Sequence, residues 1–128
     1  MSVTGWYLYL NGVAGRDLLV AAFSPAGRVV RQRRFVSGTR TERLLPRLAQ
    51  FLAASGGALN GIVVAQGEGS FSQSRLICSV ANALAYAHGV PLTAMASSCS
   101  VEEAAQGLCR RQAWRNILLP HYYGPAVE

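Results

Sequence analysis

The sequence predicts a single mixed α/β domain, built on a five-stranded sheet with helices packed on its faces. Its first third carries three short apolar runs separated by turn residues, a pattern typical of an antiparallel meander. Amphipathic stretches then alternate with apolar runs, as they do where helices connect the strands of one sheet. The 128 residues are enough for one domain of ordinary size, and residues 111–128 are expected to form a C-terminal tail.

The meander should contain three strands, at residues 6–10, 18–23 and 28–36. Gly12 lies in the first connection, and the segment Ser24-Pro25-Ala26-Gly27 has the composition of a hairpin turn. The third strand mixes charged with apolar residues, which indicates a position near the edge of the sheet.

A first helix should follow the meander. Thr39 and Glu42 form a capping box that predicts its start, and Ser55-Gly56-Gly57 predicts its end. Pro46 lies inside this helix, where a local kink is expected because proline removes one backbone hydrogen bond.

The rest of the chain alternates strand and helix. Residues 59–65 are apolar on both faces, which predicts a central, parallel strand. A second helix should span about 70–88, followed by a short strand at 92–96. Ser98 or Ser100 should cap a third helix that runs to about residue 110, and Ser100 with Glu103 forms another capping box. The order β-β-β-α-β-α-β-α is that of the ribonuclease H-like half of actin-type phosphate-binding domains.

The composition is 51% hydrophobic and 14% charged, which excludes intrinsic disorder. No apolar run approaches the roughly 18 residues of a membrane helix, and no secretion signal is recognisable. We therefore expect a cytoplasmic protein. Because soluble domains average about 25% charged residues, the low charge indicates an apolar contact surface.

All 12 basic residues are arginines, and the net charge is +6. Genome composition accounts for the absence of lysine, whereas an arginine patch that binds RNA is the functional alternative. Four arginines gather on the third strand, where charged residues also blunt an exposed sheet edge: Arg28, Arg31, Arg33 and Arg34.

The sequence predicts neither a metal site nor catalysis. Its three cysteines (Cys78, Cys99 and Cys109) form no CxxC pair and have no histidine at metal-binding spacing, so buried free thiols are expected. Metal-dependent hydrolysis needs several carboxylates around the ions. Glu68 alone among the six acidic residues follows the predicted central strand. We therefore expect no catalytic residues and no cofactor.

The segment Gly67-Glu68-Gly69-Ser70 joins that strand to the second helix. Glycines admit a close backbone approach, and a helix N-terminus attracts anions. Gly67, Gly69 and Ser70 are therefore a possible phosphate loop, although the carboxylate of Glu68 would repel a phosphate.

Three segments resemble the TsaB (YeaZ) family in order and spacing: Thr-Glu-Arg-Leu-Leu-Pro at 41–46, Gly-Glu-Gly-Ser-Phe-Ser-Gln-Ser-Arg-Leu-Ile at 67–77, and Ala-Asn-Ala-Leu-Ala-Tyr-Ala-His-Gly-Val-Pro-Leu at 81–92. The resemblance covers roughly residues 6–110. It implies a non-catalytic member of the actin/Hsp70-like ATPase superfamily. Such a protein is a dimerisation platform for TsaD, the enzyme that places threonylcarbamoyl on adenosine 37 of certain transfer RNAs.

The chain departs from that family at several positions. Asn11 stands where the family usually has an aspartate, Glu68 replaces a proline, and Gln73 and Cys78 replace glycines. The family's second, smaller domain is not expected within this chain. A reduced TsaB and a divergent paralogue with another role are both compatible with these departures.

The second helix is expected to contact a partner because its apolar arc, on the order of 240°, exceeds the roughly 100° of a one-sided helix. Its large apolar residues should pack on the sheet. Its small residues and two leucines of the first helix should face a TsaD-like protein or a second copy: Ser74, Cys78, Ala81, Ala85, Leu48 and Leu52. Burial under the chain's own helices is the alternative for this arc, and an RNA-binding module is the alternative function.

Overall fold

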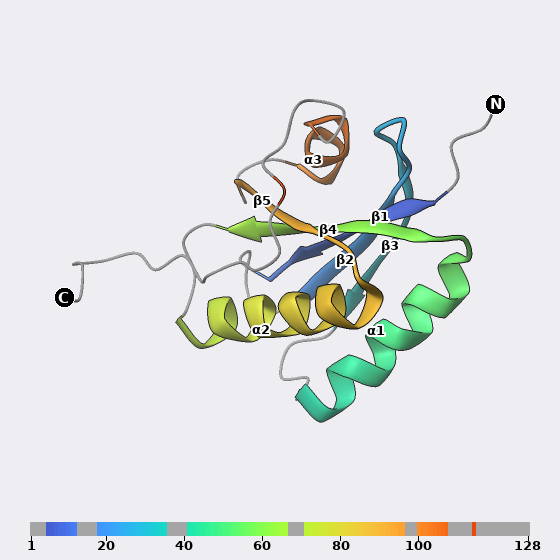
Figure 1. Ribbon diagram of the computed structural model, residues 1–128. Helices are drawn as coiled ribbons and strands as arrows, with labels where there is room; N and C mark the ends of the chain where they lie inside the picture. The colour runs from blue at the N-terminus through green and yellow to red at the C-terminus, as the bar shows by residue number, and fades with distance from the viewer. Residues whose placement is uncertain are drawn as a thin grey trace.

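The computed structural model describes residues 5–12, 18–35, 41–66, 71–96, 100–107 and 114. They form three layers, with α1 and α2 on one face of a twisted sheet and α3 on the other (Figure 1). The elements are β1 (Trp6–Asn11), β2 (Leu18–Phe23), β3 (Val29–Phe35), α1 (Thr41–Ser55), β4 (Leu59–Gln66), α2 (Phe71–His88), β5 (Leu92–Ala96) and α3 (Val101–Gly107).

The strand order β3-β2-β1-β4-β5 confirms the predicted mixed five-stranded sheet. β1 pairs with β2, and β2 with β3, in antiparallel orientation, whereas β4 is parallel to both β1 and β5. The prediction of a central, parallel fourth strand is therefore confirmed. Its residues Ile62 to Ala65 are at most 3% exposed, because helices cover both of its faces.

Two hydrophobic cores lie on the two faces of the sheet. The larger joins β-strand side chains to α1 and α2, and includes Trp6, Leu48, Phe51 and Ala81. The smaller lies between the sheet and α3, where the rings of Tyr9 and Phe23 stack with their centroids 5.0 Å apart. The alternation of side chains along β1 supplies both cores, as expected for a strand with two covered faces.

The helix ends agree with the sequence where they are described. α1 ends at Ser55, and Gly56 and Gly57 follow with φ values of 65° and 68°, a conformation that glycine adopts without strain. Pro46 lies within α1 as expected. Thr39 and the side chain of Glu42 lie outside the described residues, so the capping box predicted there stays a prediction.

The second predicted capping box is confirmed at α3. The backbone N–H of Ser100 donates to Oε1 of Glu103 at 3.0 Å, and the backbone N–H of Glu103 donates to Oγ of Ser100 at 3.1 Å. The pKa of Glu103 lies below its ordinary value, because hydrogen bonds to its carboxylate from the Ser100 backbone N–H, and then from the Ser100 hydroxyl, favour the charged form. The carboxylate is fully exposed, so this is a local property of the helix start.

We expect Ser100→Ala to raise the pKa of Glu103 only part of the way to its ordinary value, because the backbone N–H donor remains. A carboxyl pKa that is lowered by folding stabilises α3 above the unfolded-state pKa. That contribution is lost as the pH falls through the folded-state value. NMR titration of the Glu103 carboxyl group in both proteins checks this, and an equal or lower pKa in the variant would contradict it.

Trp114 lies against the α3-side face of the sheet, well separated in sequence from the residues it covers. Its ring stacks on Tyr7 with centroids 5.6 Å apart and an interplanar angle of 29°. The indole lies directly over Gly61, where an added Cβ would be 2.8 Å from Cζ3 of Trp114. The absence of a side chain at Gly61 is therefore what admits the indole to the surface of β4.

Gly61→Ala should displace Trp114 and lower the free energy of unfolding by about 1–3 kcal/mol, the usual cost of overpacking. Chemical denaturation and the indole N–H resonance of Trp114 measure the two effects. Gly107→Ala is the matched control, because a Cβ there would lie 3.7 Å from Cε of Met95, an ordinary contact distance. Equal behaviour of the two variants would show that Trp114 does not depend on Gly61.

Candidate functional site

The carboxyl ends of β1 and β4, at Asn11 and Gln66, lie at the same edge of the sheet. The two strands are parallel, and Leu10 is paired with Val64, so Asn11 and the segment after Gln66 leave the sheet together. Ligands of open α/β sheets bind at this kind of edge. Gly67, Gly69 and Ser70, with Glu68, lie outside the described residues, so the phosphate loop stays a prediction.

Asn11 is buried at this edge, and its Nδ2 donates a hydrogen bond to the hydroxyl of Tyr9 at 3.1 Å. An amide in this place carries no charge with which to bind a cation. Across the described ranges, no three His, Cys, Asp or Glu side chains gather as a metal site would require.

The orientation of α2 corrects the predicted partner surface. Cys78, Ala81 and Ala85 are 4%, 0% and 2% exposed, and Ala81 and Ala85 belong to the core beneath the helix. The small-residue stripe therefore faces the chain's own sheet, and the expectation that it contacts a partner is wrong for these three residues. The side chain of Ser74 lies outside the described residues.

The physical reason is the small size of these side chains. Ala81 and Ala85 lie on the part of α2 that packs on β1, β4 and β5, where short side chains let the helix axis approach the strands. Ile77 and Val80 are also buried on this face, so the chain itself covers an arc of about 160° of the helix. The sequence had left open burial under the chain's own helices; the arc is buried within the chain, but against the strands of the sheet, and α3 lies on the other face.

The two leucines of α1 are also core residues. Leu48 is fully buried, and Leu52 is half-buried and packs against the same core cluster. The prediction that Leu48 contacts a partner is therefore wrong. Leu52 can contact a partner only through the exposed part of its side chain.

Four exposed residues of α2 form a different surface, which we call the outer face: Ser79, Ala83, Tyr86 and Ala87. Tyr86 is 91% exposed, an unusual position for a large aromatic side chain. Beside it lies a depression of about 700 Å³, lined by Asn82, Gly89 and Pro91 among others. The sequence analysis missed this surface because it placed the partner contact on the small-residue stripe, although the tyrosine at position 86 was the available signal.

The ends of the same helix are well defined. Gly89 has a φ of 65°, and the backbone N–H of Val90 donates to the carbonyl of Ala85 at 3.0 Å, which closes the helix before β5. Among the described helices, none is long and apolar enough to cross a membrane.

Solved structures that resemble this chain include two from Pseudomonas aeruginosa. YeaZ from Pseudomonas aeruginosa is 25% identical with a TM-score of 0.58, and the match covers 72% of this chain and 44% of YeaZ. A second structure, described as a protein with similarity to peptidase YeaZ from the same organism, is 26% identical with a TM-score of 0.59, over 72% of this chain and 43% of that one. No protein-family model and no curated protein matches the chain.

The sheet order and these likenesses define an α/β domain of the ribonuclease H-like, actin-type class. Within that class, the chain is related to the TsaB (YeaZ) family, as its three sequence motifs indicate. It spans less than half the length of the two relatives, with 44% and 43% of them covered.

The burial of α2 predicts opposite effects for two neighbouring alanines. Ala81→Arg places an unpaired charge in the core and should cost more than about 4 kcal/mol, which is enough to prevent folding. Ala83→Arg adds the same side chain to the outer face and should leave the free energy of unfolding within about 0.5 kcal/mol. Circular dichroism and chemical denaturation check this. A folded Ala81→Arg protein of wild-type stability would show that α2 is oriented otherwise.

Proposed function

We propose that this protein is a non-catalytic, TsaB-like partner of a TsaD-like enzyme in the threonylcarbamoyl modification of adenosine 37 of transfer RNA. The observation that carries the proposal is the likeness to YeaZ over 72% of the chain. The motif at 67–77 supports it, since it resembles the family motif at the junction between β4 and α2. The alternative is a divergent paralogue that pairs with itself.

A role without catalysis is supported by the chemistry of the sheet edge. Asn11 offers a neutral amide, committed to the Tyr9 hydroxyl, where hydrolases of this class would need a carboxylate for metal-phosphate chemistry. Glu68 is the single acidic residue that directly follows β4 in the sequence. One carboxylate is fewer than metal-ion catalysis of phosphoryl transfer or hydrolysis uses.

The proposed contact with the partner is the outer face of α2. Its four residues are uncharged, so a partner can cover them without desolvating an ion. Tyr86 is suited to anchor such a contact, because tyrosine buries a large area while its hydroxyl remains able to hydrogen-bond. The depression beside Tyr86 gives a partner side chain a place to insert.

The experiment combines the purified chain with TsaD from the same organism. We expect a complex by multi-angle light scattering, and we expect Ala83→Arg to weaken it at least tenfold by calorimetry, because an arginine in the centre of the interface must be desolvated. Tyr86→Ala should weaken it as well, as truncation of an aromatic anchor does.

Gln106→Arg is the matched control. Gln106 is exposed on α3, on the opposite face of the sheet, so the same change of charge should leave the affinity unaltered. A wild-type chain that forms only homodimers in the presence of TsaD would favour the divergent paralogue. A complex that Ala83→Arg and Gln106→Arg affect equally would place the contact elsewhere.

A further inference from the structure

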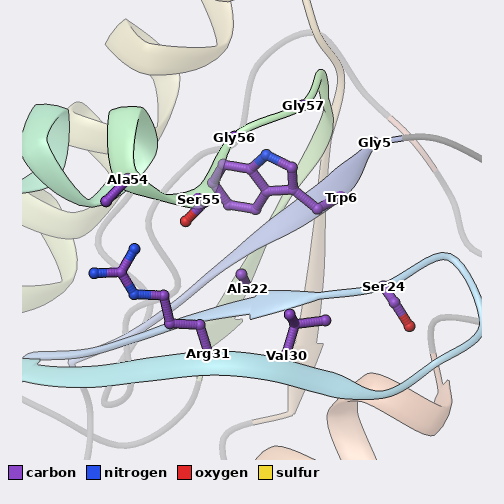
Figure 2. A pocket seen from close by; sticks show the side chains of 10 residues that line it. All are labelled: Gly5, Trp6, Ala22, Ser24, Val30, Arg31, Ala54, Ser55, Gly56 and Gly57. Carbon is purple, nitrogen blue, oxygen red and sulfur yellow. The ribbon is translucent and has the colours of Figure 1, made fainter.

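A second pocket lies at the other end of the sheet from the phosphate loop. It has a volume of about 450 Å³ and opens between the start of β1, the edge formed by β2 and β3, and the turn that follows α1 (Figure 2). Gly57 lies in its wall just before β4, whereas Gly67 follows the end of β4. At about 3.3 Å per residue, the eight residues of β4 separate the two places by roughly 25 Å.

An irregularity in β3 shapes this pocket. Ala22 is paired with Arg31 and Phe23 with Val29, so Val30 is an extra residue on the edge strand. Such a bulge redirects side chains, and here both Val30 and Arg31 line the pocket. Val30 is 67% exposed, so the pocket has an apolar rim that water now covers.

Arg31 places an unmatched positive charge at the pocket. Its guanidinium carbon lies 4.9 Å from the centroid of the Phe51 ring, a cation–π contact that holds the side chain against α1. The residues that line the pocket include no aspartate or glutamate. Within the described part of the chain, no carboxylate forms an ion pair with Arg31.

Trp6 provides a second unmatched donor in the same wall. The residue is 6% exposed, and its Nε1 is buried without a hydrogen-bond acceptor among the described residues. A buried donor without an acceptor costs free energy, so it indicates a missing partner. Figure 2 shows the indole under the turn of Gly56 and Gly57, and a Cβ on Gly56 would meet nothing within 4 Å.

We propose that this pocket binds a small organic carboxylate. The carboxylate is held by the guanidinium of Arg31, and the apolar body of the ligand lies against Val30, Ala22 and the Trp6 ring. The indole of Trp6 lies in the wall of the pocket, so its N–H resonance reports whether a ligand is bound. An anion fits because the lining residues include the guanidinium of Arg31 and no aspartate or glutamate, and the volume lies in the range of small-molecule sites.

The test titrates the protein with benzoate and with benzamide, its neutral counterpart, in ¹⁵N-resolved NMR spectra. Trp114→Phe identifies which indole N–H resonance belongs to Trp6. We expect benzoate to shift the Trp6 indole resonance. We also expect benzoate to bind at least tenfold more tightly than benzamide, because benzamide cannot accept a charge-assisted hydrogen bond from Arg31.

Three variants locate the charge. Arg31→Met should weaken benzoate binding about tenfold or more, and Arg31→Lys should restore part of the affinity. Arg33→Met is the matched control: Arg33 is exposed on the same strand but does not line the pocket, so its removal should change the affinity less than twofold. The backbone resonances of each variant report whether it is folded.

A titration with a short peptide distinguishes two sources of the carboxylate, a peptide C-terminus and a free acid. Acetyl-Gly-Gly-Phe with a free C-terminus should bind more tightly than benzoate if the natural ligand is a peptide terminus, and more weakly if it is a free acid. The C-terminal amide of the peptide should not bind in either case. The proposal is overturned if benzoate does not bind, if benzamide binds equally well, or if Arg33→Met loses as much affinity as Arg31→Met.

Discussion

The parallel pairing of β1 with β4 is the interaction on which the rest of the structure depends. It joins the antiparallel meander to the alternating half of the chain and places two strands with buried side chains on both faces at the centre of the sheet. Both faces of these strands must be covered, so the chain has to place helices on both faces of the sheet. The same pairing brings Asn11 and the end of β4 to one edge, and Gly5 and the start of β4 to the other.

The elements of this fold were predictable where local chemistry marks their ends. β2 and β5 have the bounds read from the sequence, because a hairpin turn follows the first and Gly89-Val90-Pro91 precedes the second. The capping box of Ser100 and Glu103 was recognisable because its two hydrogen bonds involve neighbouring residues of the chain. β4 ends one residue later than expected, at Gln66, a boundary that side-chain polarity alone does not define.

The orientation of α2 was not predictable by the same means. Its periodicity located a wide apolar arc but did not decide which part of that arc the sheet would cover. Ala81 fits a close helix–helix contact as well as it fits a helix close to strands, and the answer depends on the distance between the layers. The bulge at Val30 and the docking of Trp114 on Gly61 were hidden for a related reason, since each depends on register or on residues far apart in sequence.

The corrected orientation also changes the interpretation of the chain's low charge. Much of the apolar content, 51% of the residues, is needed to fill two cores within a chain of 128 residues, so it is not available to a partner. The four residues of the outer face are uncharged and, apart from Tyr86, small. A contact on that face therefore relies on one aromatic anchor and close backbone approach, whereas the pocket lined by Trp6 and Arg31 relies on a guanidinium. These are two chemically different surfaces, although both lie toward the end of the sheet where β4 and β5 begin.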